Sequence, residues 1–224
     1  MSRSASRVPR ELADLPYAAA LSPHRGDLEA GAAYDTVHFD QASFDAQEAP
    51  GARFLDCAFT GVSLHDAGLR RCRFTGVWLS DVRVTLSDLA ESEWSDATFS
   101  GGILAGAEAY GSTLTRVVFT GCKLDSVNFR EAELTEVSFT DCLLRDVDLS
   151  GASLRRASFA GSRLTGVDIS RARLDRVDLR GAELGLVVGA DSLRGAIITS
   201  GQLAAIAPVL ADSLGIVVDD GQER

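Results

Sequence analysis

The sequence is short of basic residues and lacks several common signals. Its 22 basic residues are outnumbered by 32 acidic residues, which gives a net charge of −10. Direct nucleic-acid binding is therefore not expected, because it needs lysine and arginine to displace counterions from phosphates. No apolar run approaches the ~18 residues of a membrane helix, and the polar first ten residues are not followed by the hydrophobic segment of a secretory signal. We expect a cytoplasmic protein that binds neither nucleic acid nor membrane.

Motifs for metal binding or catalysis are also missing. The cysteines are Cys57, Cys72, Cys122 and Cys142, and the histidines are His24, His38 and His65. The cysteines form no C-x-x-C pair, and the histidines lack the spacing of metal ligands. We expect the histidines to decorate the surface. No Ser-His-Asp set can be argued, so the sequence predicts no metal, no cofactor and no enzymatic activity.

The sequence does contain a repeat of five residues. From Phe39 to Leu184, every fifth residue is large and apolar at 30 consecutive positions, except for Ala49 and Ala109. A second column, two residues before each large one, is almost always small and includes all four cysteines. Neither a helical period of 3.6 nor a strand period of two fits this pattern. A chain that turns a corner every five residues does fit it, with both columns pointing inward and the cysteines as buried structural thiols.

The repeating units resemble the pentapeptide-repeat family, whose motif is a small residue, a polar residue, Leu or Phe, and two variable positions. Examples are AELTE at 132–136 and VDLSG at 147–151, and the resemblance covers about 150 of the 224 residues. It implies an all-β fold, a right-handed quadrilateral β-helix with four pentapeptides per coil. Residues twenty apart should then stack, which would place Phe99, Phe119 and Phe139 in one column.

The two ends of the chain break the repeat. A solenoid needs caps there, because its terminal strands would otherwise present unpaired edges. We predict three segments: a disordered tail and N-terminal cap (1–34), the β-helix (35–198), and a C-terminal helix with a short strand and an acidic tail (199–224). After Leu184 the register slips by one residue, and a final turn centres on Leu193 and Ile198.

The predicted C-terminal helix has an apolar stripe. Its members are Leu203, Ile206, Leu210 and Leu214. We expect Ser200 as the N-cap, a kink or break at Pro208, an end at Gly215, and a short strand at Ile216–Val218. The stripe is compatible with two roles. It can cover the last coil, or it can also form a homodimer interface, as the counterpart helices do in some members of the resembling family.

Charge is distributed unevenly along the chain. Residues 81–150 carry 5 basic and 13 acidic groups, whereas residues 151–184 carry 7 basic and 4 acidic groups. The candidate partner-binding acidic surface consists of Asp88, Glu91, Glu93, Asp96, Glu108, Glu131, Glu133, Glu136 and Asp148. A solvated surface without a partner is the alternative interpretation of these charges.

Two functional hypotheses follow. The resemblance implies that the chain is a non-enzymatic, protein-binding scaffold, and some family members are DNA mimics that bind DNA gyrase or topoisomerase IV and modulate quinolone sensitivity. The alternative is an interaction solenoid with an unrelated protein partner, which would bind the weakly charged face bearing an exposed Trp78, Val118 and a ladder of Thr and Ser residues. The chain lacks the long inserted loops of one DNA-mimic subgroup, and its arginine-rich coils at 151–184 depart from simple DNA mimicry.

Overall fold

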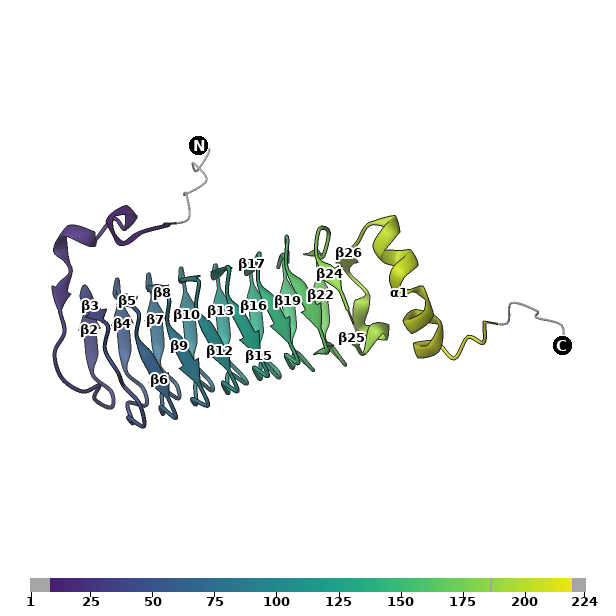
Figure 1. The fold of residues 1–224 in the computed structure, drawn as a ribbon. Helices are drawn as coiled ribbons and strands as arrows, with labels where there is room; N and C mark the ends of the chain where they lie inside the picture. The colour runs from purple at the N-terminus through teal and green to yellow at the C-terminus, as the bar shows by residue number, and fades with distance from the viewer. Residues whose placement is uncertain (1–8, 186, 219–224) are drawn as a thin grey trace.

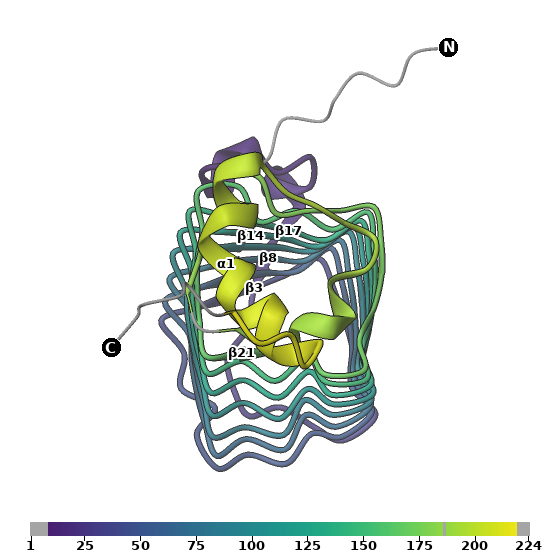
Figure 2. The same ribbon diagram turned by 90° about the vertical axis from the view of Figure 1, so that its right-hand side faces the viewer.

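The computed structural model describes residues 9–185 and 187–218, which form an elongated, four-sided β-solenoid (Figures 1 and 2). Short parallel strands stack along its faces, and each pairs with the strand one coil away. The pairing step is twenty residues, as in Phe99 with Phe119 and Phe119 with Phe139. The predicted right-handed quadrilateral β-helix is confirmed.

The four sides are named faces A to D. Face A carries β1 (Ser22–Pro23), β3 (Val37–Asp40), β5 (Ala58–Thr60), β8 (Trp78–Ser80), β11 (Thr98–Ser100), β14 (Val118–Thr120), β17 (Ser138–Thr140), β23 (Val177–Asp178) and β26 (Ala196–Ile197). Face B carries β2 (Ala33–Asp35), β4 (Arg53–Leu55), β7 (Arg73–Thr75), β10 (Glu93–Ser95), β13 (Thr113–Thr115), β16 (Glu133–Thr135), β19 (Ser153–Arg155) and β22 (Arg173–Asp175).

Face C lies opposite face B. It carries β6 (Ser63–His65), β9 (Arg83–Thr85), β12 (Ile103–Ala105), β15 (Lys123–Asp125), β18 (Leu143–Arg145), β20 (Arg163–Thr165) and β24 (Glu183–Leu184). Face D has single bridges, which run from the Glu48–Gly68 pair to the Asp148–Asp168 pair, and then β21 (Val167–Asp168) and β25 (Val187–Val188). The helical elements are η1 (Leu12–Asp14), η2 (Ala18–Ala20), η3 (Ala190–Leu193) and α1 (Ser200–Ser213).

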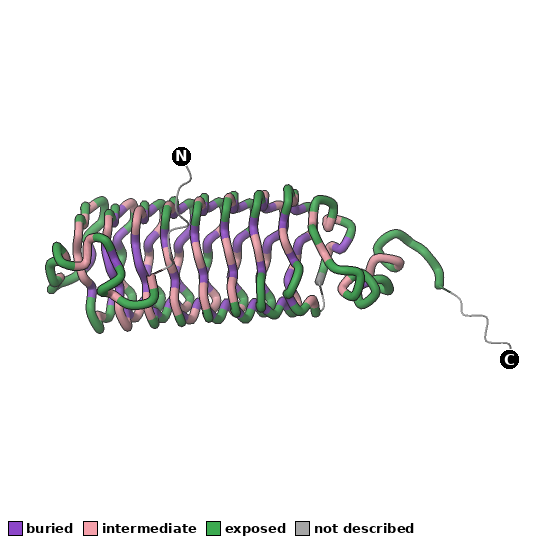
Figure 3. The backbone as a smooth tube through the Cα atoms, turned by 90° about the horizontal axis from the view of Figure 1, so that it is seen from above, coloured by how far each residue is buried: buried purple, intermediate pink, exposed green. Residues whose placement is uncertain are grey.

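The core fills the inside of the solenoid. Buried and less buried residues alternate along most of each coil (Figure 3), because successive residues of a strand point to opposite sides. The large column contains stacked phenylalanine rings, whose centroids are 4.6 Å apart for Phe99 and Phe119 and 4.8 Å apart for Phe119 and Phe139. Small residues of the second column, such as Ala132 and Ala152, are completely buried beside them.

On face D, several outward side chains bond to the local backbone. Its outward aspartates accept hydrogen bonds from the backbone N–H two residues further on: Asp88 from Ala90 at 2.9 Å and Asp148 from Ser150 at 2.8 Å. Such side-chain bonds compete with the strand ladder and favour a turn. Asp88 and Asp148, two of the candidate surface acids, therefore also shape the backbone of this face.

The N-terminal cap differs from the prediction in three respects. Tyr34 of β2 pairs with Phe54 in the twenty-residue register, so the solenoid begins at Ala33 rather than at 35. Strand β1 pairs with β3 at an offset of fifteen residues, and it is therefore not another regular coil. His24 is half-buried, with its ring 4.9 Å from the ring of Phe39, which contradicts the surface position expected for it. The predicted disordered tail falls largely on residues 1–8, outside the described residues.

The last coil confirms the predicted register slip. Val177 pairs with Ala196 and Asp178 with Ile197, a step of nineteen residues. Helix α1 then lies across the open end of the solenoid (Figure 2). Its N-cap is Thr199 rather than Ser200, because the Thr199 hydroxyl accepts the N–H of Gln202 at 3.2 Å.

Two expectations for the C-terminal segment are wrong, namely a helix break at Pro208 and a strand at Ile216–Val218. Helix α1 continues through Pro208, which lies on its exposed side, where water can bond to the carbonyl that proline leaves without a donor. Gly215 ends the helix as predicted, with a left-handed φ of 68°. The Ile216 N–H then bonds back to Ala211 O at 2.8 Å, and Ile216–Val218 form no strand. The acidic tail at 219–224 lies outside the described residues, and no helix within the described ranges is long and apolar enough to cross a membrane.

Candidate interaction surfaces

The nine candidate acidic residues occupy four columns rather than one patch. Asp88, Glu108 and Asp148 lie on face D, Glu91 and Glu131 at the corner of faces D and B, Glu93 and Glu133 on face B, and Asp96 and Glu136 at the corner of faces B and A. The corner positions require a left-handed backbone, with φ near 56° at both Glu91 and Glu131. The structure therefore spreads the predicted surface over two faces and two corners.

Ion pairs with the neighbouring coil occupy six of the nine carboxylates. The pairs are Arg70–Asp88 at 3.8 Å, Arg70–Glu91, Arg71–Glu91 at 3.8 Å, Arg73–Glu93 at 2.8 Å, Arg116–Asp96 at 2.6 Å, Arg156–Glu136, and Arg130–Asp148 at 3.8 Å. Several partners are twenty residues apart, because residues at this spacing stack in the same column. Much of the charge that the sequence placed on the surface is thus compensated within the chain.

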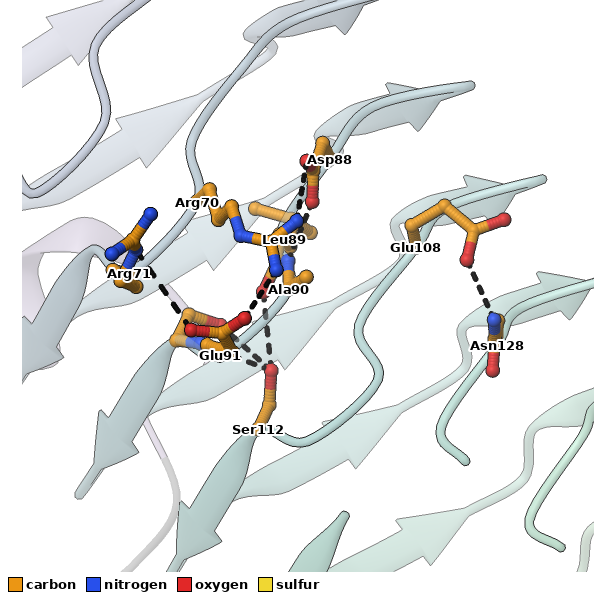
Figure 4. A network of polar contacts seen from close by, with 10 residues as sticks. Arg70, Arg71, Asp88, Leu89, Ala90, Glu91, Glu108, Ser112 and Asn128 are labelled. Carbon is orange, nitrogen blue, oxygen red and sulfur yellow. Dashed lines mark hydrogen bonds and ion pairs between the residues drawn. The ribbon is translucent and has the colours of Figure 1, made fainter. Parts of the chain in front are cut away.

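One such cluster lies where face D meets the corner (Figure 4). The guanidinium of Arg70 reaches both Asp88 and Glu91 and sits 5.2 Å from the centre of the Tyr110 ring. Further along the same face, the Asn128 amide donates to Glu108 at 2.6 Å. These contacts hold the side chains of consecutive coils against one another.

The ion pairs lower the pKa of the carboxylates that they hold. Hydrogen bonds from Arg73 lower the pKa of Glu93, and those from Arg116 lower the pKa of Asp96. Both pairs are solvent-exposed, so each contributes little to the stability of the fold. Of the nine candidate acids, Glu108, Glu131 and Glu133 have no ion-pair partner among the described residues, and Glu131 and Glu133 have no polar side-chain contact there either, whereas Glu108 accepts from Asn128.

Helix α1 has one buried side chain and several exposed apolar ones. Ile206 is 6% exposed, and it lines an apolar cavity of about 40 Å³ beneath the helix together with Leu179 and Leu184. Leu203 is 50% exposed and Leu214 is 67% exposed, whereas Leu210 is half-buried. Covering the last coil therefore uses only part of the predicted apolar stripe.

Comparison with protein families identifies the repeat. Residues 38–76 match the family described as "Pentapeptide repeats (8 copies)", and residues 112–187 match "Pentapeptide repeat region". The two matches together span just over half of the chain. The chain belongs to the pentapeptide-repeat family. A search of curated proteins finds no match.

Solved structures of other pentapeptide-repeat proteins resemble the chain. HetL, a regulator of heterocyst differentiation from the cyanobacterium Nostoc sp., is 19% identical with a TM-score of 0.49, over 84% of this chain and 96% of HetL. Full-length QnrB1, a plasmid-mediated fluoroquinolone resistance protein, is 21% identical with a TM-score of 0.31, over 87% and 100%. A protein from the Arabidopsis thaliana thylakoid lumen is 26% identical with a TM-score of 0.26, over 49% and 77%. The assignment to the family rests on the sequence matches and the coil pairing rather than on these superpositions.

The four cysteines of this pentapeptide-repeat protein are buried and free, which confirms the predicted structural thiols. Burial raises the pKa of Cys57 and of Cys72 to about 11. Cys122 and Cys142 stack in consecutive coils, and a hydrogen bond between them raises the pKa of Cys142 and lowers that of Cys122. The small column is therefore filled by buried thiols in the same way as by alanine or valine.

One predicted interaction residue is not on the surface. Trp78 was expected to be exposed on face A, but it is only 4% exposed, because the N-terminal cap folds over it and packs Leu15 and Tyr17 against it. Val118, two coils further along, remains uncovered and half-buried. The apolar residues Leu12, Leu15 and Tyr17, within an otherwise irregular segment, were the available signal that the cap needs an apolar surface to cover.

Proposed function

We propose that this pentapeptide-repeat protein is a non-catalytic scaffold that binds a protein partner through its outer faces. Two observations support this proposal. The inward side chains form the core and are not available to a partner. Glu131 and Glu133 lie outward on adjacent columns without an ion-pair partner among the described residues. Such uncompensated carboxylates are available to a basic protein surface. The scaffold is proposed to act in the cytoplasm, which is supported by its four free thiols.

The partner class that we propose is DNA gyrase or topoisomerase IV, with the scaffold acting as a DNA mimic that modulates quinolone sensitivity. The support is electrostatic, since the chain has a net charge of −10 and its uncompensated carboxylates Glu108, Glu131 and Glu133 lie within the acidic stretch 81–150. Arg171 and Arg173 lie two coils beyond Glu131 and Glu133. Their positive charges limit the proposed DNA mimicry to the middle of the rod.

Gyrase supercoiling, titrated with the purified protein with and without a quinolone, tests this partner. We expect inhibition or protection at micromolar protein, and a loss of about three- to ten-fold in potency for the double variant Glu131→Gln/Glu133→Gln. Glu93→Gln is the matched control, because Arg73 already compensates that carboxylate. If the wild type shows no inhibition and no protection, a topoisomerase partner is excluded. If all variants are equally potent, this corner is excluded as the contact.

We also propose that the scaffold forms a homodimer through α1. The exposed Leu203 and Leu214 support it, since covering the last coil does not use them. Sedimentation velocity is expected to show a dimer for the wild type and a monomer for Leu203→Glu/Leu214→Glu, with Ala204→Glu, an exposed position on the same helix, as the control. A wild-type protein that stays monomeric at about 100 μM would rule out this interface.

A further inference from the structure

A groove lies on face A where the N-terminal cap ends. It has a volume of about 430 Å³, and its lining includes Pro9 and Tyr17 from the cap and Trp78, Thr98 and Val118 from the solenoid. The cap covers the first coils of this face and leaves the later ones open (Figure 1). The groove is therefore continuous with the surface on which the chain already binds one of its own segments.

The cap shows how a segment binds to this face. Leu15 packs against Trp78 and Ala58, and the Tyr17 hydroxyl donates to the outward carbonyl of Gly76 at 2.6 Å. Burial raises the pKa of Tyr17, so this hydroxyl remains a donor. An aliphatic side chain and a phenol two residues apart thus make the contacts of this segment with Trp78 and the Gly76 carbonyl, alongside the apolar residues Leu12, Ala18 and Leu21.

The same acceptors recur beyond the cap. The carbonyls of Asp96 and Arg116 occupy the position of Gly76 in the next two coils, and among the described residues no hydrogen bond is made to either oxygen. Burial and the neighbouring Asp35 raise the pKa of Asp56, another acceptor at the groove. The groove is consequently rich in acceptors and poor in donors.

One buried donor beneath the groove lacks an acceptor. The buried indole Nε1 of Trp78 has no hydrogen-bond partner in the described part of the chain, although a buried N–H without a partner costs about 1–3 kcal/mol. The floor next to it is uncharged, with Thr98 and Val118 in one column of the groove lining. The single ion pair at the rim, Arg116–Asp96, is internally compensated.

We propose that this groove docks an uncharged, extended segment of a partner protein, which places a leucine-like side chain against Thr98 and Val118 and donates a tyrosine hydroxyl to the Arg116 carbonyl. The segment would bind as Leu15 and Tyr17 do two coils earlier. The inference rests on the proposed scaffold function and adds to it the chemistry of a bound segment. It is independent of the acidic corner at Glu131 and Glu133.

The probe is the acetylated and amidated peptide Leu-Pro-Tyr-Ala-Ala, which has the sequence of residues 15–19. Titrated into the full chain and followed by amide chemical shifts, it is expected to bind saturably and to shift the resonances of Thr98 and Val118. Val118→Arg and, separately, Thr98→Arg should weaken binding about ten-fold or more. Thr135→Arg, an outward position on face B, is the matched control and should leave the affinity unchanged. Replacing the peptide tyrosine by phenylalanine should weaken binding about two- to ten-fold, since it removes one hydrogen bond.

Three outcomes would overturn the proposal. The first is an absence of saturable binding at about 5 mM peptide, and the second is equal affinity for Val118→Arg and the wild type. The third is a set of chemical-shift changes confined to Ala58 and the cap, which would mean that the peptide displaces the cap instead. Thermal unfolding of both arginine variants checks that they remain folded. Gyrase inhibition that persists in Val118→Arg, together with an absence of peptide binding, would reject the groove while leaving the scaffold function intact.

Discussion

Replacing Phe119 by alanine is expected to lower the free energy of unfolding by about 3–5 kcal/mol. The side chain is 1% exposed, and its ring stacks between those of Phe99 and Phe139. The backbone ladder fixes the distance between coils, so the two remaining rings cannot close the gap, and the cavity term of the loss is retained. Urea unfolding followed by circular dichroism would measure the change.

Thr120→Ala is the control for this prediction, because Thr120 is the next residue of β14 and points outward. It should change the free energy of unfolding by no more than about 0.5 kcal/mol. A loss below about 1 kcal/mol for Phe119→Ala would show that the phenylalanine stack does not hold consecutive coils together.

Replacing Trp78 by alanine is expected to cost about 3–5 kcal/mol and to release the N-terminal cap. Trp78 and Ala58 are the part of face A against which Leu15 is buried, so removing the Trp78 indole leaves Leu15 with Ala58 as its remaining buried partner in this cluster. Trypsin should then cleave after Arg25 faster than in the wild type. Cleavage rates and denaturant unfolding together would measure both consequences.

Val118→Ala is the matched control, since Val118 lies in the same column but outside the cap. It should leave the cleavage rate after Arg25 unchanged and cost less than about 1 kcal/mol. An unchanged cleavage rate in Trp78→Ala would mean that β1 alone, through its pairing with β3, holds the cap in place.

The fold was predictable because each pentapeptide repeats the same pattern of one large and one small inward residue. Phe119, Leu124 and Phe129 are large because they point inward, and each has a counterpart twenty residues away with which it stacks. The periodicity therefore gives the register as well as the fold. The single slip of one residue before Ile198 was equally visible, since it displaces the large column by one position.

The cap was less predictable, because its contacts are made once and repeat nowhere. Leu15 and Tyr17 contain no information about which coil they meet, and only the structure places them over Trp78. Helix α1 was located by its apolar stripe, but the effect of Pro208 depends on which side of the helix faces water. The stripe alone does not determine this orientation.

The charge pattern contained more information than a net count reveals. Opposite charges twenty residues apart, such as Arg73 with Glu93 and Asp96 with Arg116, become ion pairs once the coil length is known. Applied to the nine candidate acids, that spacing leaves five without a basic partner: Asp88, Glu108, Glu131, Glu133 and Asp148. The structure removes Asp88 and Asp148 from this set, because Arg70 and Arg130 reach them at a spacing of eighteen residues.

The twenty-residue step also links sequence length to orientation. Removing one complete coil would shorten the rod and leave every later side chain on its original face. Removing a single pentapeptide would instead turn everything beyond the deletion by a quarter of a revolution relative to the cap, and Glu131 would leave its corner for the next one. In this architecture the number of residues before a surface position sets the direction in which that position points.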